Sequence, residues 1–317
     1  MADLLPARTA PGKFLRHDIT ADGSPRAVVR FKRLETLWLN TGTLCNIECA
    51  NCYIDSSPTN DQLVYLTVRD ARPFLAEAAG LGAEEIGLTG GEPFMNPEII
   101  DLAEECLRAG FTVLILTNAM RPMMRPRLQR GLAELRSIYS DRIALRVSLD
   151  HYEERLHDEE RGSGGFIETL MGLAWLVREG FNVSVAGRKR WGEAEGATRE
   201  GYRRLFAENS LAIDAADLAR LVLFPEMDAR ADTPEITTAC WDILKKSPDS
   251  VMCATSRMVV KRKGETSPVV LACTLIPYER AFELGASLAQ SLGPVALNHP
   301  HCSKFCVLGG ASCSPHA

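Results

Sequence analysis

Long apolar runs are missing from this sequence. Runs such as residues 113–116 and 269–272 fall far short of the roughly 20 residues that a membrane-spanning helix needs. The N-terminal residues also lack the apolar centre of a secretory signal peptide. We therefore expect no membrane partner and a cytoplasmic location.

An excess of basic residues is missing as well. Lysine and arginine number 36 against 41 aspartates and glutamates, which gives a net charge of −5. Because binding to nucleic acid relies on a positive surface, this balance argues against nucleic acid as a partner. No G-x-G-x-x-G motif follows the first predicted strand, so a dinucleotide-binding fold has no support. With 46% hydrophobic and 24% charged residues, the composition is that of a globular protein of one or two domains.

Cysteine, by contrast, is abundant. The chain has ten cysteines, and without a secretion signal we expect a reducing compartment, where disulfides are rare. Metal or cluster ligation is then the leading explanation for the cysteines that lie in groups. Cys106 and Cys240 fall in helical contexts and are expected to be buried thiols. The grouped cysteines are Cys45, Cys49, Cys52, Cys253, Cys273, Cys302, Cys306 and Cys313.

Short β-prone segments alternate with longer helical segments over much of the chain. This alternation predicts βαβ units and a parallel sheet. Six units are too few for a complete eight-unit barrel, so an open partial barrel and a doubly wound sheet both fit. The predicted strands are 36–40, 85–89, 112–117, 143–149, 182–186 and 218–224, and the predicted helices are 67–81, 97–109, 125–137, 167–179 and 199–209.

The pattern changes near both ends of the chain. Residues 1–33 are expected to form an N-terminal arm, and residues 34–230 hold the repeating units. From residue 235 onward two β-like stretches flank a turn at Gly264, and six of the ten cysteines are found there. We therefore predict a small, cysteine-rich α+β domain over residues 235–317.

The first cysteine group has a compact spacing. Cys45, Cys49 and Cys52 form C-x3-C-x2-C directly after the first predicted strand. Three thiolates in one loop can converge on one metal centre, and they leave one iron of a [4Fe–4S] cluster without a protein ligand. Such an open coordination position is typical of catalytic metal sites. The alternative is a three-cysteine zinc site with a distant fourth ligand.

A second motif, Gly90-Gly91-Glu92-Pro93, ends the next predicted strand. Together with the cysteine loop it resembles the radical S-adenosylmethionine (SAM) enzymes, over about residues 34–225. The resemblance implies a partial (β/α)6 TIM-like barrel, with the cluster held by the three cysteines and SAM bound at its open iron. It further implies reductive cleavage of SAM to a 5′-deoxyadenosyl radical, which abstracts a hydrogen atom from the substrate.

The resemblance also implies residues that bind SAM. The turn Gly90–Pro93 meets the methionyl amine, and Glu92 can accept charged hydrogen bonds from it. The aromatic Tyr53 follows the third cysteine, whereas the position before it, often bulky in the family, holds Asn51. Polar residues at strand ends complete the expected site, because ligands of parallel α/β folds bind there: Thr117, Asn118, Ser148, Asp150 and Arg188. Ser148 and Arg188 are expected at the ribose or carboxylate, and Asp150 alternatively caps the next helix.

The later cysteines resemble the auxiliary-cluster domains called SPASM or twitch. Five are grouped, fewer than the full SPASM pattern, so one auxiliary [4Fe–4S] cluster is expected. Cys253, Cys273, Cys302 and Cys306 are the chosen ligands, with Cys313 as the rival fourth. The alternative is a structural zinc site that uses cysteine together with His299 or His301.

The substrate stays open between two classes. A ribosomal peptide fits a SPASM-like maturase, whereas a small molecule fits a twitch-like dehydrogenase, and the short stretch before the first strand favours a small molecule or a leaderless peptide. A flavodoxin or ferredoxin is the expected electron donor. The rival from another class is a non-catalytic iron–sulfur carrier. The glycine-rich segment 161–165 is interpreted as a hinge before the helix that follows.

Overall fold

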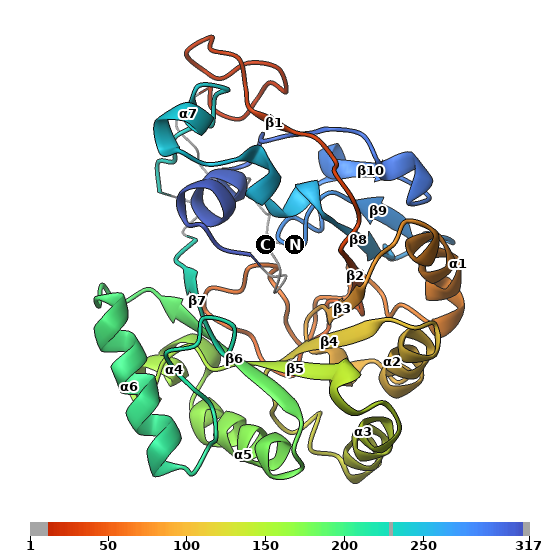
Figure 1. The fold of residues 1–317 in the computed structure, drawn as a ribbon, viewed down its shortest axis with the longest axis vertical. Helices are drawn as coiled ribbons and strands as arrows, with labels where there is room; N and C mark the ends of the chain where they lie inside the picture. Colours follow the sequence, from red (N-terminus) through yellow and green to blue (C-terminus); the bar gives the residue numbers. More distant parts are fainter. Residues whose placement is uncertain (1–11, 228–230, 313–317) are drawn as a thin grey trace.

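The computed structural model describes residues 12–227 and 231–312 (Figure 1). Its centre is a nine-stranded sheet in the order β10-β9-β8-β2-β3-β4-β5-β6-β7. From β2 to β7 the strands run parallel, and each pairs with the next one along the chain. These strands are β2 (Thr36–Asn40), β3 (Glu85–Thr89), β4 (Thr112–Thr117), β5 (Ile143–Ser148), β6 (Asn182–Lys189) and β7 (Leu221–Pro225).

The helices between these strands lie on the outer face of the curved sheet (Figure 1). A doubly wound sheet carries helices on both faces, so this arrangement is that of a partial barrel. The predicted α/β partial barrel is thus confirmed, and within residues 12–227 and 231–312 the sheet does not close. The helices are α1 (Val68–Gly80), α2 (Ile99–Arg108), α3 (Pro126–Tyr139), α4 (Glu154–Arg161), α5 (Gly165–Arg178), α6 (Glu195–Glu208) and α7 (Cys240–Leu244).

Local sequence explains where these elements begin and what they bury. Helix α1 begins at a capping box, in which the Thr67 hydroxyl accepts a hydrogen bond from the Asp70 amide and the Asp70 carboxylate accepts one from the Thr67 amide. Phe74 and Leu75 of this helix then join the main apolar core beneath the sheet. Removing such side chains from water is the main source of stability.

The C-terminal part of the chain extends the same sheet. Strand β8 (Ser256–Val260) pairs in parallel with β2, beginning with Ser256 opposite Thr36. Strands β9 (Val269–Leu271) and β10 (Glu283–Gly285) continue it antiparallel, so that β8 and β9 form the predicted hairpin around Gly264. The C-terminal strands and β7 therefore lie at opposite edges of the sheet (Figure 1).

The N-terminal segment packs against the C-terminal part of the chain. Strand β1 (Val28–Val29) pairs with β11 (Val295–Ala296), and the Arg26 guanidinium forms a buried ion pair with Glu235 at 2.5 Å. The described part of the predicted arm is thus anchored. The predicted division at residues 33–34 and 230–235 stays a prediction. Among the described residues, no helix is both long enough and apolar enough to cross a bilayer.

Candidate active site

A pocket lies at the carboxyl ends of the parallel strands. It has a volume of about 190 Å³ and is bounded by the loop after β2, by the ends of β3 to β7 and by the C-terminal part of the chain. Most of the residues predicted to bind a cluster or SAM line it, which brings together segments far apart in sequence. They are Cys45, Cys49, Cys52, Tyr53, Gly90, Gly91, Thr117, Asn118, Ser148, Asp150 and Arg188. Glu92 and Pro93 are not among the lining residues.

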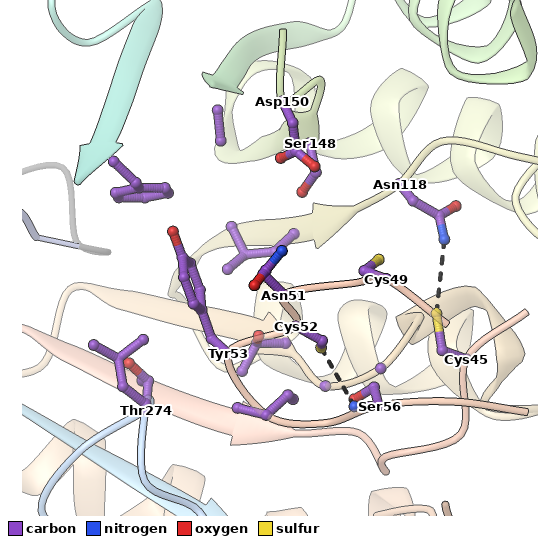
Figure 2. Close-up of a pocket in the computed structure, with 18 of the residues that line it drawn as sticks. Cys45, Cys49, Asn51, Cys52, Tyr53, Ser56, Asn118, Ser148, Asp150 and Thr274 are labelled. Carbon is purple, nitrogen blue, oxygen red and sulfur yellow. Dashed lines mark hydrogen bonds between the residues drawn. The ribbon is translucent and has the colours of Figure 1, made fainter. Parts of the chain in front are cut away.

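The three cysteines of the first group face this pocket from one loop (Figure 2). Two of their sulfur atoms accept hydrogen bonds: Cys52 from the Ser56 amide at 3.3 Å, and Cys45 from the Asn118 side chain at 3.9 Å. Hydrogen bonds to cysteine sulfur stabilise thiolate ligands and tune iron–sulfur clusters. The donor set and its surroundings therefore fit the predicted cluster.

Burial favours the protonated form of the Cys45 and Cys49 thiols. Desolvation raises the pKa of Cys45 to about 12 and also raises that of Cys49, although the nearby Arg161 charge opposes both shifts. Thiols in such a site stay protonated on their own, and metal coordination removes the proton. The loop is therefore suited to hold sulfur ligands whose thiolate form depends on metal.

The glycine pair holds the cysteine loop in place. The Gly91 amide donates to the Gly42 carbonyl, and a Cβ atom on Gly91 would lie 2.4 Å from the Leu44 carbonyl oxygen. Gly90 has a φ of +146°, and its Cβ would lie 2.4 Å from the Gly42 carbonyl oxygen. Only glycine permits so close an approach of the two backbones. The turn after β3 thus packs directly under the segment that leads to Cys45.

Glu92 is buried and does not line the pocket. Its buried carboxylate accepts hydrogen bonds from the Phe94 amide, the Thr117 hydroxyl and the Asn118 amide, at 3.1, 2.8 and 2.8 Å. Burial raises the pKa of Glu92 to about 7, although these hydrogen bonds oppose the shift. Pro93 is buried and begins a short 3-10 turn. In this arrangement Glu92 connects the turn after β3 to the end of β4, and the expectation that it meets the SAM amine stays a prediction.

Arg161 is a pocket residue that sequence reasoning missed. It ends α4, lines the pocket and forms a two-pronged ion pair with Asp150, at 2.7 and 3.1 Å. Asp150 does not cap α4, whose N-cap residue is Glu153. The segment expected to be a hinge therefore supplies a buried cation. A signal for this ion pair was present in the sequence, since Arg161 follows the strand-end Asp150 by a short distance. It was overlooked because the highly charged α4 resembled a loop.

Arg188 lies near the end of β6 and is nearly buried. One terminal nitrogen (Nη1) donates to the Asn51 carbonyl and to the Glu160 carboxylate, both at 3.1 Å. The guanidinium carbon lies 4.6 Å from the centre of the Tyr53 ring, a cation–π distance. Asn51 also donates from its side chain to Glu160, so the position where many relatives have a bulky residue supports this ionic cluster.

The other side of the pocket is apolar and aromatic. Phe305 and Leu275 come from the C-terminal part of the chain, and Phe224 comes from β7. The Tyr53 ring meets the Phe305 ring edge-on, with centroids 6.4 Å apart, and Phe224 meets Phe305 at 5.3 Å. In Figure 2, Cys45 and Thr274 lie at opposite ends of the view. The pocket therefore has a sulfur-lined polar end and a more apolar end.

A second, smaller cavity of about 20 Å³ lies in the C-terminal part. Four of the five predicted auxiliary ligands line it together: Cys253, Cys273, Cys302 and Cys306. The last two belong to a π-helix, Cys302–Leu308, which places both at the cavity. The rival ligand Cys313 lies outside the described residues.

Histidine is close to this second cavity as well. His301 lines it, whereas His299 stacks edge-on against His301 with ring centres 4.5 Å apart. Burial lowers the pKa of His299 to about 3, so its ring is neutral. Among the described residues, no three His, Cys, Asp or Glu side chains are close enough to share one metal ion. Cys106 is buried in α2, and Cys240 begins α7 and is partly buried.

Comparison with known proteins gives a family match in this region. Residues 39–188 match the profile of the radical SAM superfamily. The AdoMet-dependent heme synthase of Methanosarcina barkeri is 30% identical over 142 residues, 44% of this chain and 38% of that protein. The antilisterial bacteriocin subtilosin biosynthesis protein AlbA of Bacillus subtilis is 28% identical over 172 residues, 54% of this chain and 36% of that protein. The chain thus spans well under half the length of either relative.

Solved structures show the same fold over more of the chain. SuiB of Streptococcus suis bound to S-adenosylmethionine aligns over 85% of this chain and 64% of its own, with a TM-score of 0.57 and 15% identity. SuiB bound to its precursor peptide SuiA aligns over 81% of this chain and 63% of its own, with a TM-score of 0.58 and 14% identity. The shared fold therefore extends beyond the region matched by the family profile.

Proposed function

We propose that the protein uses residues 39–188, which match the radical SAM superfamily, to abstract a hydrogen atom from a peptide substrate. The observation that carries this proposal is the single pocket lined by Cys45, Cys49 and Cys52 together with the glycine turn after β3. A carrier of clusters or electrons has no need for a polar, strand-end pocket beside its cysteines. This feature favours an enzyme.

The polar end of the pocket is the proposed binding site for the cluster and SAM. When bound there, they supply a 5′-deoxyadenosyl radical for hydrogen abstraction. The three cysteines would hold the [4Fe–4S] cluster, and Gly90, Gly91, Thr117, Asn118 and Ser148 would surround SAM. Arg161, which Asp150 orients, lines the same end of the pocket and is a proposed contact of SAM.

The C-terminal cysteine cavity is the proposed site of an auxiliary [4Fe–4S] cluster. Four cysteines that line one cavity match the ligand number of such a cluster. The chemistry proposed for the whole protein is therefore an oxidation or crosslink, with the auxiliary cluster as electron acceptor. A flavodoxin or ferredoxin would reduce the first cluster, in a reducing cytoplasmic compartment.

A peptide is favoured over a small molecule as the substrate. The relatives include both kinds of enzyme, since one is named as a heme synthase and another as a bacteriocin biosynthesis protein. SuiB aligns over 81% of this chain, and that structure holds SuiB bound to its precursor peptide SuiA. This likeness supports the peptide substrate.

The test is anaerobic reconstitution with iron and sulfide, followed by reduction in the presence of SAM. We expect about eight irons per chain in the wild type and about four in the C45A/C49A/C52A variant, from the four-iron stoichiometry of each cluster. The wild type should release 5′-deoxyadenosine, and the triple variant should not. The matched control is C106A, because Cys106 is buried in α2 and does not line either cysteine cavity.

Two results would contradict this proposal. Release of no 5′-deoxyadenosine by the iron-loaded wild type would favour the carrier. The second result is an iron content of about four per chain in the wild type that falls to nearly zero in the triple variant. It would contradict the auxiliary cluster, and a zinc site would then be the explanation for the C-terminal cysteines.

A further inference from the structure

The Arg188 guanidinium has hydrogen-bond donors left over. Its Nε and its second terminal nitrogen (Nη2) are buried and make no hydrogen bond of standard geometry to a described residue, although the guanidinium also interacts with the Tyr53 hydroxyl. The nearest carboxylate oxygen recorded for Nη2 belongs to Glu226 at 3.9 Å, which exceeds a hydrogen-bond length. The side chain is only 7% exposed and lines the pocket. Buried donors without partners are costly, so this group is prepared for an acceptor that arrives with a ligand.

The charge around Arg188 is already balanced. Arg188 and Arg190 both pair with Glu160, at 3.1 and 2.9 Å, and Glu226 lies 3.9 and 4.0 Å from the same two arginines. Two positive and two negative formal charges cancel. A ligand carboxylate would add an uncompensated negative charge in a buried place, which is unfavourable. A neutral carbonyl oxygen satisfies the free donors and leaves the balance intact.

The position of Arg188 points to substrate rather than cofactor. Its guanidinium lies over the Tyr53 ring, and Tyr53 contacts Phe305 at the apolar end of the pocket. The second pocket arginine, Arg161, is bound to Asp150 instead, through hydrogen bonds of 2.7 and 3.1 Å. The two arginines thus have different side-chain partners, and Arg188 is the one that lies over Tyr53.

We propose that Arg188 binds a backbone amide carbonyl of the peptide substrate, next to a side chain that packs against Phe224, Phe305 and Leu275. This inference rests on the proposed function for the peptide, but the binding itself needs no radical chemistry. It makes Arg188 a substrate-binding residue instead of a ligand of SAM.

The test uses two matched probes, N-methyl-3-phenylpropanamide and 3-phenylpropanoate, which share a phenyl group and differ in the acceptor. Their binding to reconstituted, SAM-loaded protein is followed by ligand-observed NMR titration. We expect the amide to bind better than the carboxylate. In R188K, which keeps the charge opposite Glu160 but loses the planar fork, amide affinity should fall about tenfold, as for a lost buried hydrogen bond.

The matched control is R190Q, since Arg190 contacts the same Glu160 but lines the adjoining cavity and not the pocket that Arg188 lines. It should bind the amide within about twofold of the wild type, well below the tenfold change of a lost hydrogen bond. SAM affinity, measured by equilibrium dialysis, should be unchanged in R188K. Loss of SAM affinity in R188K, tighter binding of the carboxylate, or no binding of the amide to the wild type would each overturn the inference.

The two proposals fail in distinguishable ways. Amide binding that depends on Arg188, in a reconstituted protein that does not cleave SAM, supports this inference and contradicts the radical reaction. Suppose instead that the wild-type protein cleaves SAM but binds the amide no better than R188K does. That result supports the radical reaction and contradicts the inference about Arg188.

Discussion

Asp150 and Arg161 form a nearly buried ion pair, in which both carboxylate oxygens accept hydrogen bonds from the guanidinium at 2.7 and 3.1 Å. Burial alone would raise the pKa of Asp150, but the charge and hydrogen bonds of Arg161 outweigh it and hold that pKa below its usual value. The pair connects the end of β5 to the end of α4. The pair therefore fixes the position of the Arg161 guanidinium relative to Cys45 and Cys49.

The D150N variant is expected to lose this placement. An amide cannot balance the buried Arg161 charge, so the free energy of unfolding should fall by about 3 kcal/mol or more, and SAM affinity should fall with it. Urea unfolding and equilibrium dialysis with SAM measure the two effects. Because the folded-state pKa of Asp150 is lowered, the stability that the pair contributes is present above its ordinary value of 3.8 and is lost as pH falls below it.

A suitable control for D150N is E200Q, which removes the exposed ion pair between Glu200 and Arg203. Exposed pairs contribute at most about 1 kcal/mol, so E200Q should hardly change unfolding. If SAM affinity is unaltered in D150N, Arg161 does not contribute to SAM binding.

Glu92 should give the protein a distinct pH dependence. Burial raises its pKa from 4.5 to about 7, so the folded protein keeps this proton at pH values where the unfolded chain has lost it. Stability contributed by Glu92 therefore falls as pH rises from about 4.5 to about 7. E92Q has no proton to lose, and its single amide oxygen cannot accept from all three donors that Glu92 satisfies.

We expect E92Q to be less stable than the wild type by about 1–3 kcal/mol near pH 5, with the difference shrinking toward pH 8. Urea unfolding of both proteins at several pH values measures it. Parallel pH profiles for the two proteins would show that Glu92 is ionised in the folded state throughout this range.

The C-terminal cysteines can be tested without the first cluster. Cys302 is partly buried and lines the cavity with Cys253, Cys273 and Cys306, and desolvation raises its pKa to about 12. In C302S the iron content should fall from about eight to about four, because serine is a poor ligand for this cluster. C240S is the control, since Cys240 lies in the same apolar cluster but does not line the cavity. If the iron content of C302S is unchanged and its zinc content falls, the C-terminal cysteines form a zinc site.

The regular part of the fold follows from the sequence. Strand β4 occupies the predicted residues 112–117, because a run of β-branched and aliphatic residues after a helix-ending glycine has few alternatives in an α/β chain. The same logic located α1, whose capping box and apolar face both lie in a short stretch of sequence. Local signals are enough for such elements.

Contacts between distant segments could not be predicted. The pairing of β8 with β2 depends on which sheet edge is left uncovered, which no local pattern records. Helix α4 was missed because its sequence ERLHDEER has almost no apolar periodicity, and Arg161 was missed with it. The family resemblance predicts that Glu92 contacts SAM. Its three hydrogen bonds within the protein could not be predicted in this way, because they depend on how the turn after β3 meets the end of β4.

Gly91 tests whether the turn after β3 positions the cysteine loop. In G91A the new Cβ would lie 2.4 and 2.6 Å from the carbonyl oxygens of Leu44 and Thr43, so the backbone before Cys45 must move. Such overpacking costs about 1–3 kcal/mol. We therefore expect a lower unfolding midpoint and less iron at the first cluster, with the C-terminal iron retained.

The control for this change is G196A, at a glycine of α6 where a Cβ meets nothing within 4 Å. Alanine should stabilise that helix by about 0.5–1 kcal/mol, because glycine carries an entropic cost there. If G91A lowers stability whereas G196A raises it, the loss of stability in G91A is due to contact with the cysteine loop. If G91A instead binds iron and unfolds like the wild type, the loop has room to shift, and the glycine at this position must serve the approach of SAM itself.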